Sequence, residues 1–137
     1  MLKIKSDKII VGESLFDGYL YVEDGKIAKI TAEDIPCEEC YDYTGMYVSP
    51  GFIDLHTHGA GGHSFSNSSV EEVIKGAQYH LKFGTTCVLP TVTTDTFASM
   101  RESAIIIEKA MATGEAPTIY GAHLEGPYLS KYQCGAQ

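Results

Sequence analysis

The pattern of hydrophobic and polar positions divides the chain into two parts. In the first part, residues 18–30 (GYLYVEDGKIAKI) form two β-rich arms around Asp24 and Gly25. This dipeptide suits a two-residue type I′ turn, because both central residues of that turn need a positive φ. Residues 33–45 predict a loop, and residues 46–49 predict a further short strand. No helix of useful length fits this part.

From residue 50 onward the pattern alternates between strands and helices. The β-α-β-α-β order implies a parallel sheet with right-handed crossovers, and therefore an α/β fold. The elements that we expect are strands at 51–59, 85–93 and 117–129 and helices within 68–84 and 94–114.

Capping residues mark the ends of both predicted helices. Ser69 and Glu72 have the spacing of a capping box, and Gly84 stands where a C-terminal cap is expected. For the second helix, Asp95 is the predicted N-cap and Gly114 the predicted stop.

Composition and charge narrow the classes of partner. The chain has 137 residues, a net charge of −8 and a pI of about 5.0. An acidic surface repels phosphate backbones and anionic lipid, so we expect neither nucleic acid nor a membrane as a partner. The chain has no apolar run of about 18 residues, and charged residues stand where a signal peptide needs apolar ones, so we expect a cytoplasmic protein. We interpret Cys37 and Cys40 as free thiols, in preference to metal or redox roles.

Histidines and a carboxylate stand at the ends of predicted strands. Because alternate strand residues share a face, His56 and His58 point the same way as Asp54, and Glu125 shares a face with His123. The carboxyl ends of parallel strands carry the ligand sites of α/β folds. Two imidazoles and a carboxylate suit Zn²⁺ or another divalent transition ion, which favours a metal site over two hydrogen-bonded strand-end histidines.

The positions of the remaining histidines indicate their functions less specifically. His80 lies in a predicted helix and is interpreted as a packed or surface residue. His63 lies in a glycine-rich loop, where contact with substrate and simple solvation are equally good interpretations. His123 either lines the pocket or orients a metal ligand.

Two segments carry a resemblance to a known family. The segment 48–62 (VSPGFIDLHTHGAGG) resembles the first barrel strand of the amidohydrolase superfamily. The segment 120–130 (YGAHLEGPYLS) narrows the resemblance to the N-acetylglucosamine-6-phosphate deacetylase family. The HxH pair alone is shared by dihydroorotases, hydantoinases and many others, whereas the HLEGP stretch is much more specific. The segment 130–137 (SKYQCGAQ) departs from the more usual basic run of that family.

The resemblance implies a fold and a set of site residues. Residues 1–49 are then a portion of a small β-sandwich domain, and residues 50–137 are the N-terminal part of a (β/α)8 barrel with its first three strands. It implies that His56, His58 and Glu125 bind one or two divalent ions, Zn²⁺ or Fe²⁺. It also implies that substrate lies near the residues Gly61, Gly62, His63 and Gln137.

The resemblance also implies an activity. Members of the family hydrolyse the N-acetyl group of N-acetylglucosamine 6-phosphate, an amino-sugar phosphate, to give glucosamine 6-phosphate and acetate. The general-base aspartate and further histidine ligands of the family come from later strands, so we expect an incomplete fragment that is inactive alone. We also expect its uncovered third strand to pair with another copy, as a homo-oligomer, or with the rest of the enzyme.

Two other functions remain open from the sequence. One is an amidohydrolase that acts on a cyclic amide, which the HLEGP stretch disfavours. The other is a non-catalytic, truncated module that associates with itself or binds metal without reaction.

Overall fold

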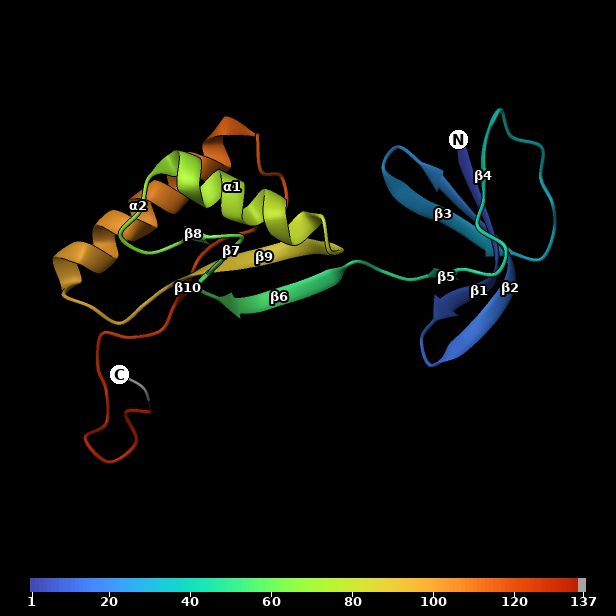
Figure 1. The fold of residues 1–137 in the computed structure, drawn as a ribbon. Coiled ribbons are helices and arrows are strands. Elements are labelled where there is room, and N and C mark those ends of the chain that lie inside the picture. The colour runs from blue at the N-terminus through green and yellow to red at the C-terminus, as the bar shows by residue number, and fades with distance from the viewer. Residues whose placement is uncertain (136–137) are drawn as a thin grey trace. The chain divides into compact units, whose positions relative to one another are not determined.

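The computed structural model describes residues 1–135, and the chain folds as two compact units. The first unit comprises Met1–Pro50, and the second begins at Gly51 (Figure 1). The first unit is built of strands alone, and the second combines strands with helices. The expected α/β fold is therefore confirmed.

The N-terminal unit is one mixed sheet of five strands. Strands β3, β2, β1 and β4 follow one another across the sheet, and β5 pairs with β1 beyond the end of β4. The pairs β1–β2 and β2–β3 are antiparallel, whereas β4 and β5 run parallel to β1. The bounds are β1 Leu2–Val11, β2 Ser14–Glu23, β3 Lys26–Thr31, β4 Glu39–Asp42 and β5 Tyr47–Val48.

The turn between β2 and β3 confirms the predicted hairpin. Asp24 has a φ of 49° and Gly25 a φ of 72°, as a type I′ turn requires of both central residues. The predicted loop at residues 33–45 was partly wrong, because it contains β4. All four residues of β4 are exposed, so the segment has no alternation of buried and exposed positions from which a strand could be predicted.

A buried tyrosine fixes the loop that leads from β3 to β4. Tyr21 is 1% exposed, and its hydroxyl accepts a hydrogen bond of 2.7 Å from the backbone N–H of Ile35. Lys3 reaches Asp34 in the same loop with an N–O distance of 2.6 Å. Among the described residues no cysteine forms a disulfide, and the Cys37 thiol donates to the Met1 carbonyl oxygen.

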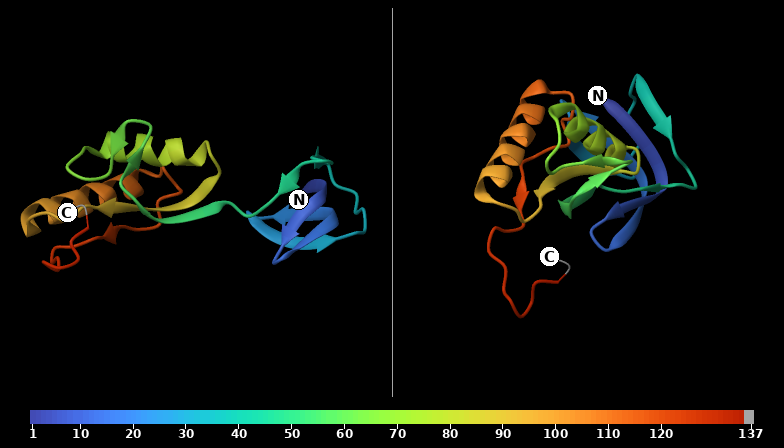
Figure 2. Two further views of the ribbon diagram at one scale, coloured as in Figure 1. Left: turned by 60° about the horizontal axis from the view of Figure 1, so that its bottom comes forward. Right: turned by 60° about the vertical axis from the view of Figure 1, so that its left-hand side comes forward.

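The second unit places two helices against a parallel sheet. Its three-stranded sheet has the order β10-β9-β6, and both helices lie on one face of it (Figures 1 and 2). A two-stranded antiparallel hairpin of β7 and β8 follows β6. The bounds are β6 Phe52–Thr57, β7 Gly59–Ala60, β8 His63–Ser64, α1 Val70–Leu81, β9 Thr85–Val92, α2 Phe97–Thr113 and β10 His123–Leu124.

The core of this unit lies between the helices and β9. Both helices contribute a stripe of buried apolar side chains with helical spacing, which packs against Val88 and Val92 of β9. Full burial of each of the larger side chains, those of Val, Ile, Phe and Met, contributes roughly 1.5–3 kcal/mol to folding. The other buried members are Phe65, Val73, Ile74, Ala77, Met100, Ile107, Ala110, Ala116 and Ile119.

Two of the three predicted barrel strands are shorter than expected. The first ends at Thr57, where the chain turns into the β7–β8 hairpin, and does not continue to Gly59. The third contains only His123–Leu124 as a strand, with one isolated bridge from Ile119 to Val88. Within residues 1–135 the strand β10 pairs with β9 alone, so it has a hydrogen-bonded neighbour on one side only.

The helix ends confirm two of the four predicted cap positions, Ser69 and Gly114. Ser69 caps α1 by accepting from the Glu72 N–H, and Gly114 ends α2 with a left-handed φ of 74°. The prediction of Asp95 as N-cap was wrong, because Thr96 holds that position and its hydroxyl accepts from the Ser99 N–H. The α1 helix ends at a C-cap residue, Lys82, two residues before Gly84.

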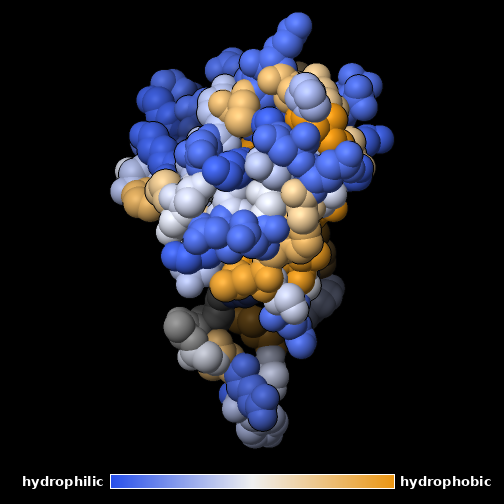
Figure 3. All heavy atoms as spheres, turned by 90° about the vertical axis from the view of Figure 1, so that its right-hand side faces the viewer, coloured by the Kyte–Doolittle hydropathy of each residue, from blue (hydrophilic) through white to orange (hydrophobic). Residues whose placement is uncertain are grey.

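The surface of the N-terminal unit carries hydrophobic side chains among hydrophilic ones (Figure 3). Independently of that view, the exposed fractions of Ile27, Met46 and Tyr47 in this unit are each more than 60%. None of the helices within residues 1–135 combines the length and the apolar character that crossing a membrane requires.

Candidate metal centre

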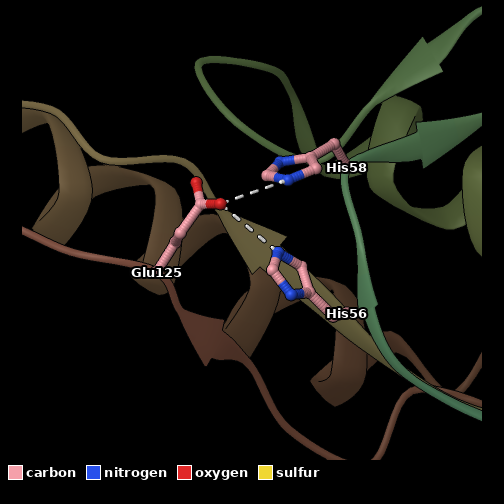
Figure 4. Close-up of side chains that lie close together, drawn as sticks. All are labelled: His56, His58 and Glu125. Carbon is pink, nitrogen blue, oxygen red and sulfur yellow. Dashed lines mark ion pairs between the residues drawn. The ribbon is translucent and has the colours of Figure 1, made fainter. Parts of the chain in front are cut away.

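Two imidazoles and a carboxylate meet at the end of the parallel sheet. The Nε2 atom of His56 lies 3.4 Å from Glu125 Oε1, and the Nε2 atom of His58 lies 3.8 Å from the same oxygen. Both rings point toward the carboxylate (Figure 4). One ligand atom from each of the three residues lies within 4.8 Å of the others. We call these three residues the histidine–carboxylate cluster.

The parallel register of the sheet explains why residues far apart in sequence meet here. His56 belongs to β6, His58 directly follows it, and Glu125 directly follows β10. Because β6 and β10 both pair in parallel with β9, their carboxyl ends lie at the same edge. The backbone N–H of Glu125 donates to the Val92 carbonyl oxygen and so fixes the chain at that edge.

Local hydrogen bonds shape the end of β6. The Thr57 N–H, between the two histidines, donates to Thr91 Oγ1 at 2.9 Å. Asp54, which the sequence placed on the same face as the histidines, is not a member of the cluster. Its carboxylate accepts a hydrogen bond from the His56 backbone N–H at 3.1 Å.

The cluster is accessible and chemically suited to a cation. The side chains of His56 and His58 are about half exposed, at 51% and 48%, whereas that of Glu125 is 21% exposed. Two neutral imidazole nitrogens and a carboxylate oxygen are ligands that zinc and similar divalent ions prefer. The arrangement therefore fits a metal ion, and the two imidazoles remain accessible to solvent.

Two further side chains contact the cluster. The Nδ1 atom of His58 lies 3.0 Å from Thr93 Oγ1, and the ring of His123 lies 4.4 Å from the ring of His56, centroid to centroid. The Nδ1 atom of His123 is buried and has no hydrogen-bond partner within residues 1–135. His123 thus lies beside the cluster residue His56, whereas Thr93 was not recognised as a site residue.

The glycine-rich loop is an ordered hairpin held by α1. Gly61 and Gly62 form its turn with φ values of 62° and 88°, and a Cβ on Gly61 would meet the Tyr79 ring at 2.4 Å. The Nδ1 atom of His63 lies 2.8 Å from the Glu72 carboxylate. Glu72 was predicted as the partner of Ser69 in a capping box, and its contact with His63 was not predicted. Gln137 lies outside the described residues.

His80 has a role in the site that the sequence did not indicate. Its Nε2 atom lies 3.2 Å from Thr57 Oγ1, so helix α1 is tied to the residue between the two cluster histidines. The sequence left His80 as a packed or surface residue, and its ring stacks near that of Phe65, with the centroids 6.1 Å apart.

Comparison with known proteins finds similarity in sequence and in fold to amino-sugar-phosphate deacetylases. The chain is 37% identical over 114 residues to an N-acetylgalactosamine-6-phosphate deacetylase of a Shewanella species, covering 80% of this chain and 29% of that protein. Its fold matches the N-acetyl-D-glucosamine-6-phosphate deacetylase of Mycobacterium smegmatis with a TM-score of 0.85 and 27% identity, covering 99% of this chain and 38% of that one. The chain therefore spans about a third of the length of these proteins.

The chain is also similar to a hydantoinase, but the two folds match less well. A D-hydantoinase of a Thermus species is 30% identical, with a TM-score of 0.52 over 80% of this chain and 24% of that one. Residues 47–131, which include all three members of the histidine–carboxylate cluster, match the model of the amidohydrolase family. The chain belongs to the amidohydrolase family of hydrolases.

Proposed function

We propose that this chain supplies part of the metal site of an enzyme that hydrolyses the N-acetyl group of N-acetylglucosamine 6-phosphate. The products are glucosamine 6-phosphate and acetate. The observation that carries the proposal is the convergence of His56, His58 and Glu125 at the end of the parallel sheet. Family membership and the similarity to two amino-sugar-phosphate deacetylases support it.

The three cluster residues would hold one or two divalent ions, Zn²⁺ or Fe²⁺. A bound ion would supply Lewis acidity toward an amide carbonyl and lower the pKa of bound water. The protein side chains hold the ion at the open end of the sheet, because His56 and His58 present Nε2 and Glu125 presents a carboxylate oxygen to the same point.

We further propose that the amino-sugar phosphate lies against the glycine-rich hairpin. Gly61 and Gly62 allow the backbone to approach a ligand closely, and His63 offers the ring nitrogen that does not contact Glu72. Gln137 is the remaining candidate for substrate contact. The similarity to an N-acetylgalactosamine-6-phosphate deacetylase makes the galactose epimer the first alternative substrate to test.

The two units would correspond to two parts of a larger fold. We propose that residues 1–49 are a portion of a small β-sandwich and that residues 50–137 are the first three strands of a (β/α)8 barrel. The TM-score of 0.85 against a deacetylase over 99% of this chain supports this assignment. The parallel order β10-β9-β6, with its helices on one face, is the arrangement that such a barrel requires.

Hydrolysis of a cyclic amide is the second candidate reaction. The similarity to a D-hydantoinase favours it, but the TM-score there is 0.52 against 0.85 for the deacetylase. A module that binds metal without reaction is the third candidate, and activity measurements separate it from the other two.

A chimera tests the proposed reaction directly. Residues 1–137 replace the matching segment of the Mycobacterium smegmatis deacetylase, and acetate release from N-acetylglucosamine 6-phosphate is measured. We expect release by the chimera and loss of release in its Glu125→Gln variant. A Glu115→Gln variant is the matched control, because Glu115 is exposed and is not a member of the histidine–carboxylate cluster. A folded, metal-loaded chimera that hydrolyses hydantoin but releases no acetate would overturn the proposal in favour of the second candidate.

The 137-residue chain alone gives a complementary result. We expect no acetate release above background, since the cluster offers three ligand residues and the general base of the family comes from a later strand. Full activity of the isolated chain would show that the base lies within it.

A further inference from the structure

The hydrogen bonds behind His58 determine which of its ring nitrogens is free. We infer that Thr93 is a positioning residue that holds His58 as the tautomer with its proton on Nδ1, so that the Nε2 lone pair faces the histidine–carboxylate cluster. The inference rests on the proposed function in one respect, because a free Nε2 is what a metal ion would need there.

Thr93 is well placed to act on His58. It directly follows the last residue of β9, and its Oγ1 lies 3.0 Å from His58 Nδ1. The Nε2 atom on the other side of the same ring is the one that lies 3.8 Å from the Glu125 carboxylate. The ring is therefore held between a hydroxyl on one nitrogen and the cluster on the other.

The hydrogen bonds of the Ser66 hydroxyl determine the direction of the hydrogen bond between Thr93 Oγ1 and His58 Nδ1. Ser66 Oγ accepts from the Thr93 N–H at 2.9 Å and lies 3.1 Å from the Thr91 carbonyl oxygen, which can only accept. The single Ser66 hydroxyl hydrogen therefore goes to Thr91. Ser66 Oγ also lies 3.3 Å from Thr93 Oγ1, so it can receive the Thr93 hydroxyl hydrogen.

The direction of the Thr93 hydroxyl determines the tautomer of His58. With its own hydrogen directed to Ser66, Thr93 Oγ1 presents a lone pair to His58 Nδ1 and accepts a proton from it. Neutral histidine in water favours the opposite tautomer, with the proton on Nε2, which would block a metal ion. Thr93 and Ser66 thus prepare His58 for metal binding before any ion arrives.

The chain offers well-matched variants for the test. Thr93→Val keeps the shape of the side chain and removes the hydroxyl, whereas Thr93→Ser keeps the hydroxyl. Thr94→Val is the control, since the Thr94 hydroxyl is buried and has no hydrogen-bond partner within the described part of the chain.

The tautomer is measured in the metal-free 137-residue chain. Long-range ¹H–¹⁵N correlation spectra distinguish the two tautomers at a pH where neutral imidazoles predominate, and a His58→Gln variant assigns the signals among the five histidines. We expect the Nδ1–H form in the wild type, in Thr93→Ser and in Thr94→Val, and a shift to the Nε2–H form in Thr93→Val. An Nε2–H form in the wild type, or an unchanged tautomer in Thr93→Val, would overturn the inference.

Metal affinity provides the second readout. We expect Thr93→Val to bind Zn²⁺ roughly 10- to 100-fold more weakly than the wild type, as loss of an outer partner of a ligand usually does, and Thr93→Ser to restore the affinity. If Thr94→Val weakens binding as much as Thr93→Val, the positioning role is wrong.

A wild type with the Nδ1–H tautomer but no Zn²⁺ binding would contradict the proposed function and leave the tautomer assignment standing. A variant that does not fold is recognised from its amide spectrum, and the wild-type and Thr93→Ser tautomers then decide the question.

Discussion

The orientation of His56 and His58 toward Glu125 depends on a few individual residues near the end of β6. His56, His58 and Glu125 were predictable from sequence because strand alternation and the placement of strand ends determine where they point. Thr93 and His80 were not, because each acts through a partner on another element, His58 and Thr57 respectively. A sequence pattern indicates that such a residue faces inward, but the partner it contacts depends on the packing of helix and sheet.

Gly61 provides a test at the residue scale. A Gly61→Ala substitution places a Cβ at 2.4 Å from the Tyr79 ring and also strains a φ of 62°, so we expect it to lower the free energy of unfolding by more than about 1 kcal/mol. Gly62→Ala is the matched control, because Gly62 has a φ of 88° but open space around its Cα. Urea unfolding followed by circular dichroism measures both, and equal losses would show that the contact with Tyr79 does not matter.

At the scale of elements, helices were predicted better than strands. The cap residues Ser69 and Gly114 and the apolar spacing of α1 are local signals, and the structure confirms them. The ends of a strand depend on its hydrogen bonds to neighbouring strands, which a local sequence pattern does not contain. The third predicted strand therefore has only two residues that pair as a strand. Leu81 fits the apolar spacing of α1 but is 44% exposed and is not a member of the buried core.

The start of α2 provides a test at this scale. Asp95 accepts hydrogen bonds from the Ser99 hydroxyl, the Thr96 N–H and the Asn67 side chain, and these lower the pKa of its carboxyl. Because the folded pKa lies below the unfolded one, the stabilisation is complete above the ordinary aspartate pKa of about 3.9 and is lost as the pH falls through the folded pKa. We therefore expect Asp95→Asn to lower the melting temperature at pH 7 and to have less effect near pH 3.

Thermal unfolding of both proteins across this pH range measures the difference. A melting-temperature difference that stays constant from pH 7 to pH 3 would show that the Asp95 charge does not stabilise the start of α2.

At the scale of the whole molecule, the order of strands and helices predicted the α/β fold, and the similarity to solved deacetylases confirms it. The sequence predicted an open edge at the third strand, β10, but not one at the first strand, β6. Within residues 1–135, β6 pairs with β9 alone, and its side chains Ile53 and Leu55 are 67% and 58% exposed. An apolar strand with an open edge favours pairing with another chain.

Self-association is therefore the expected behaviour of the isolated chain. We expect sedimentation velocity to detect dimers or larger species, and Ile53→Lys to shift the chain toward monomer because a charge on the edge strand opposes pairing. Ile27→Lys is the control, since Ile27 is similarly exposed, at 62%, but lies in the N-terminal unit. A compact wild-type monomer would argue against pairing through β6.

We propose that His56, His58 and Glu125 together bind a metal ion. The most direct test is the zinc content of the purified 137-residue chain and of its His56→Ala variant, after both have been loaded with Zn²⁺ and dialysed. We expect the wild type to retain zinc and the variant to lose most of it, because one of three converging ligands is gone. Equal zinc content in the two proteins would contradict the account, because it would place the metal elsewhere.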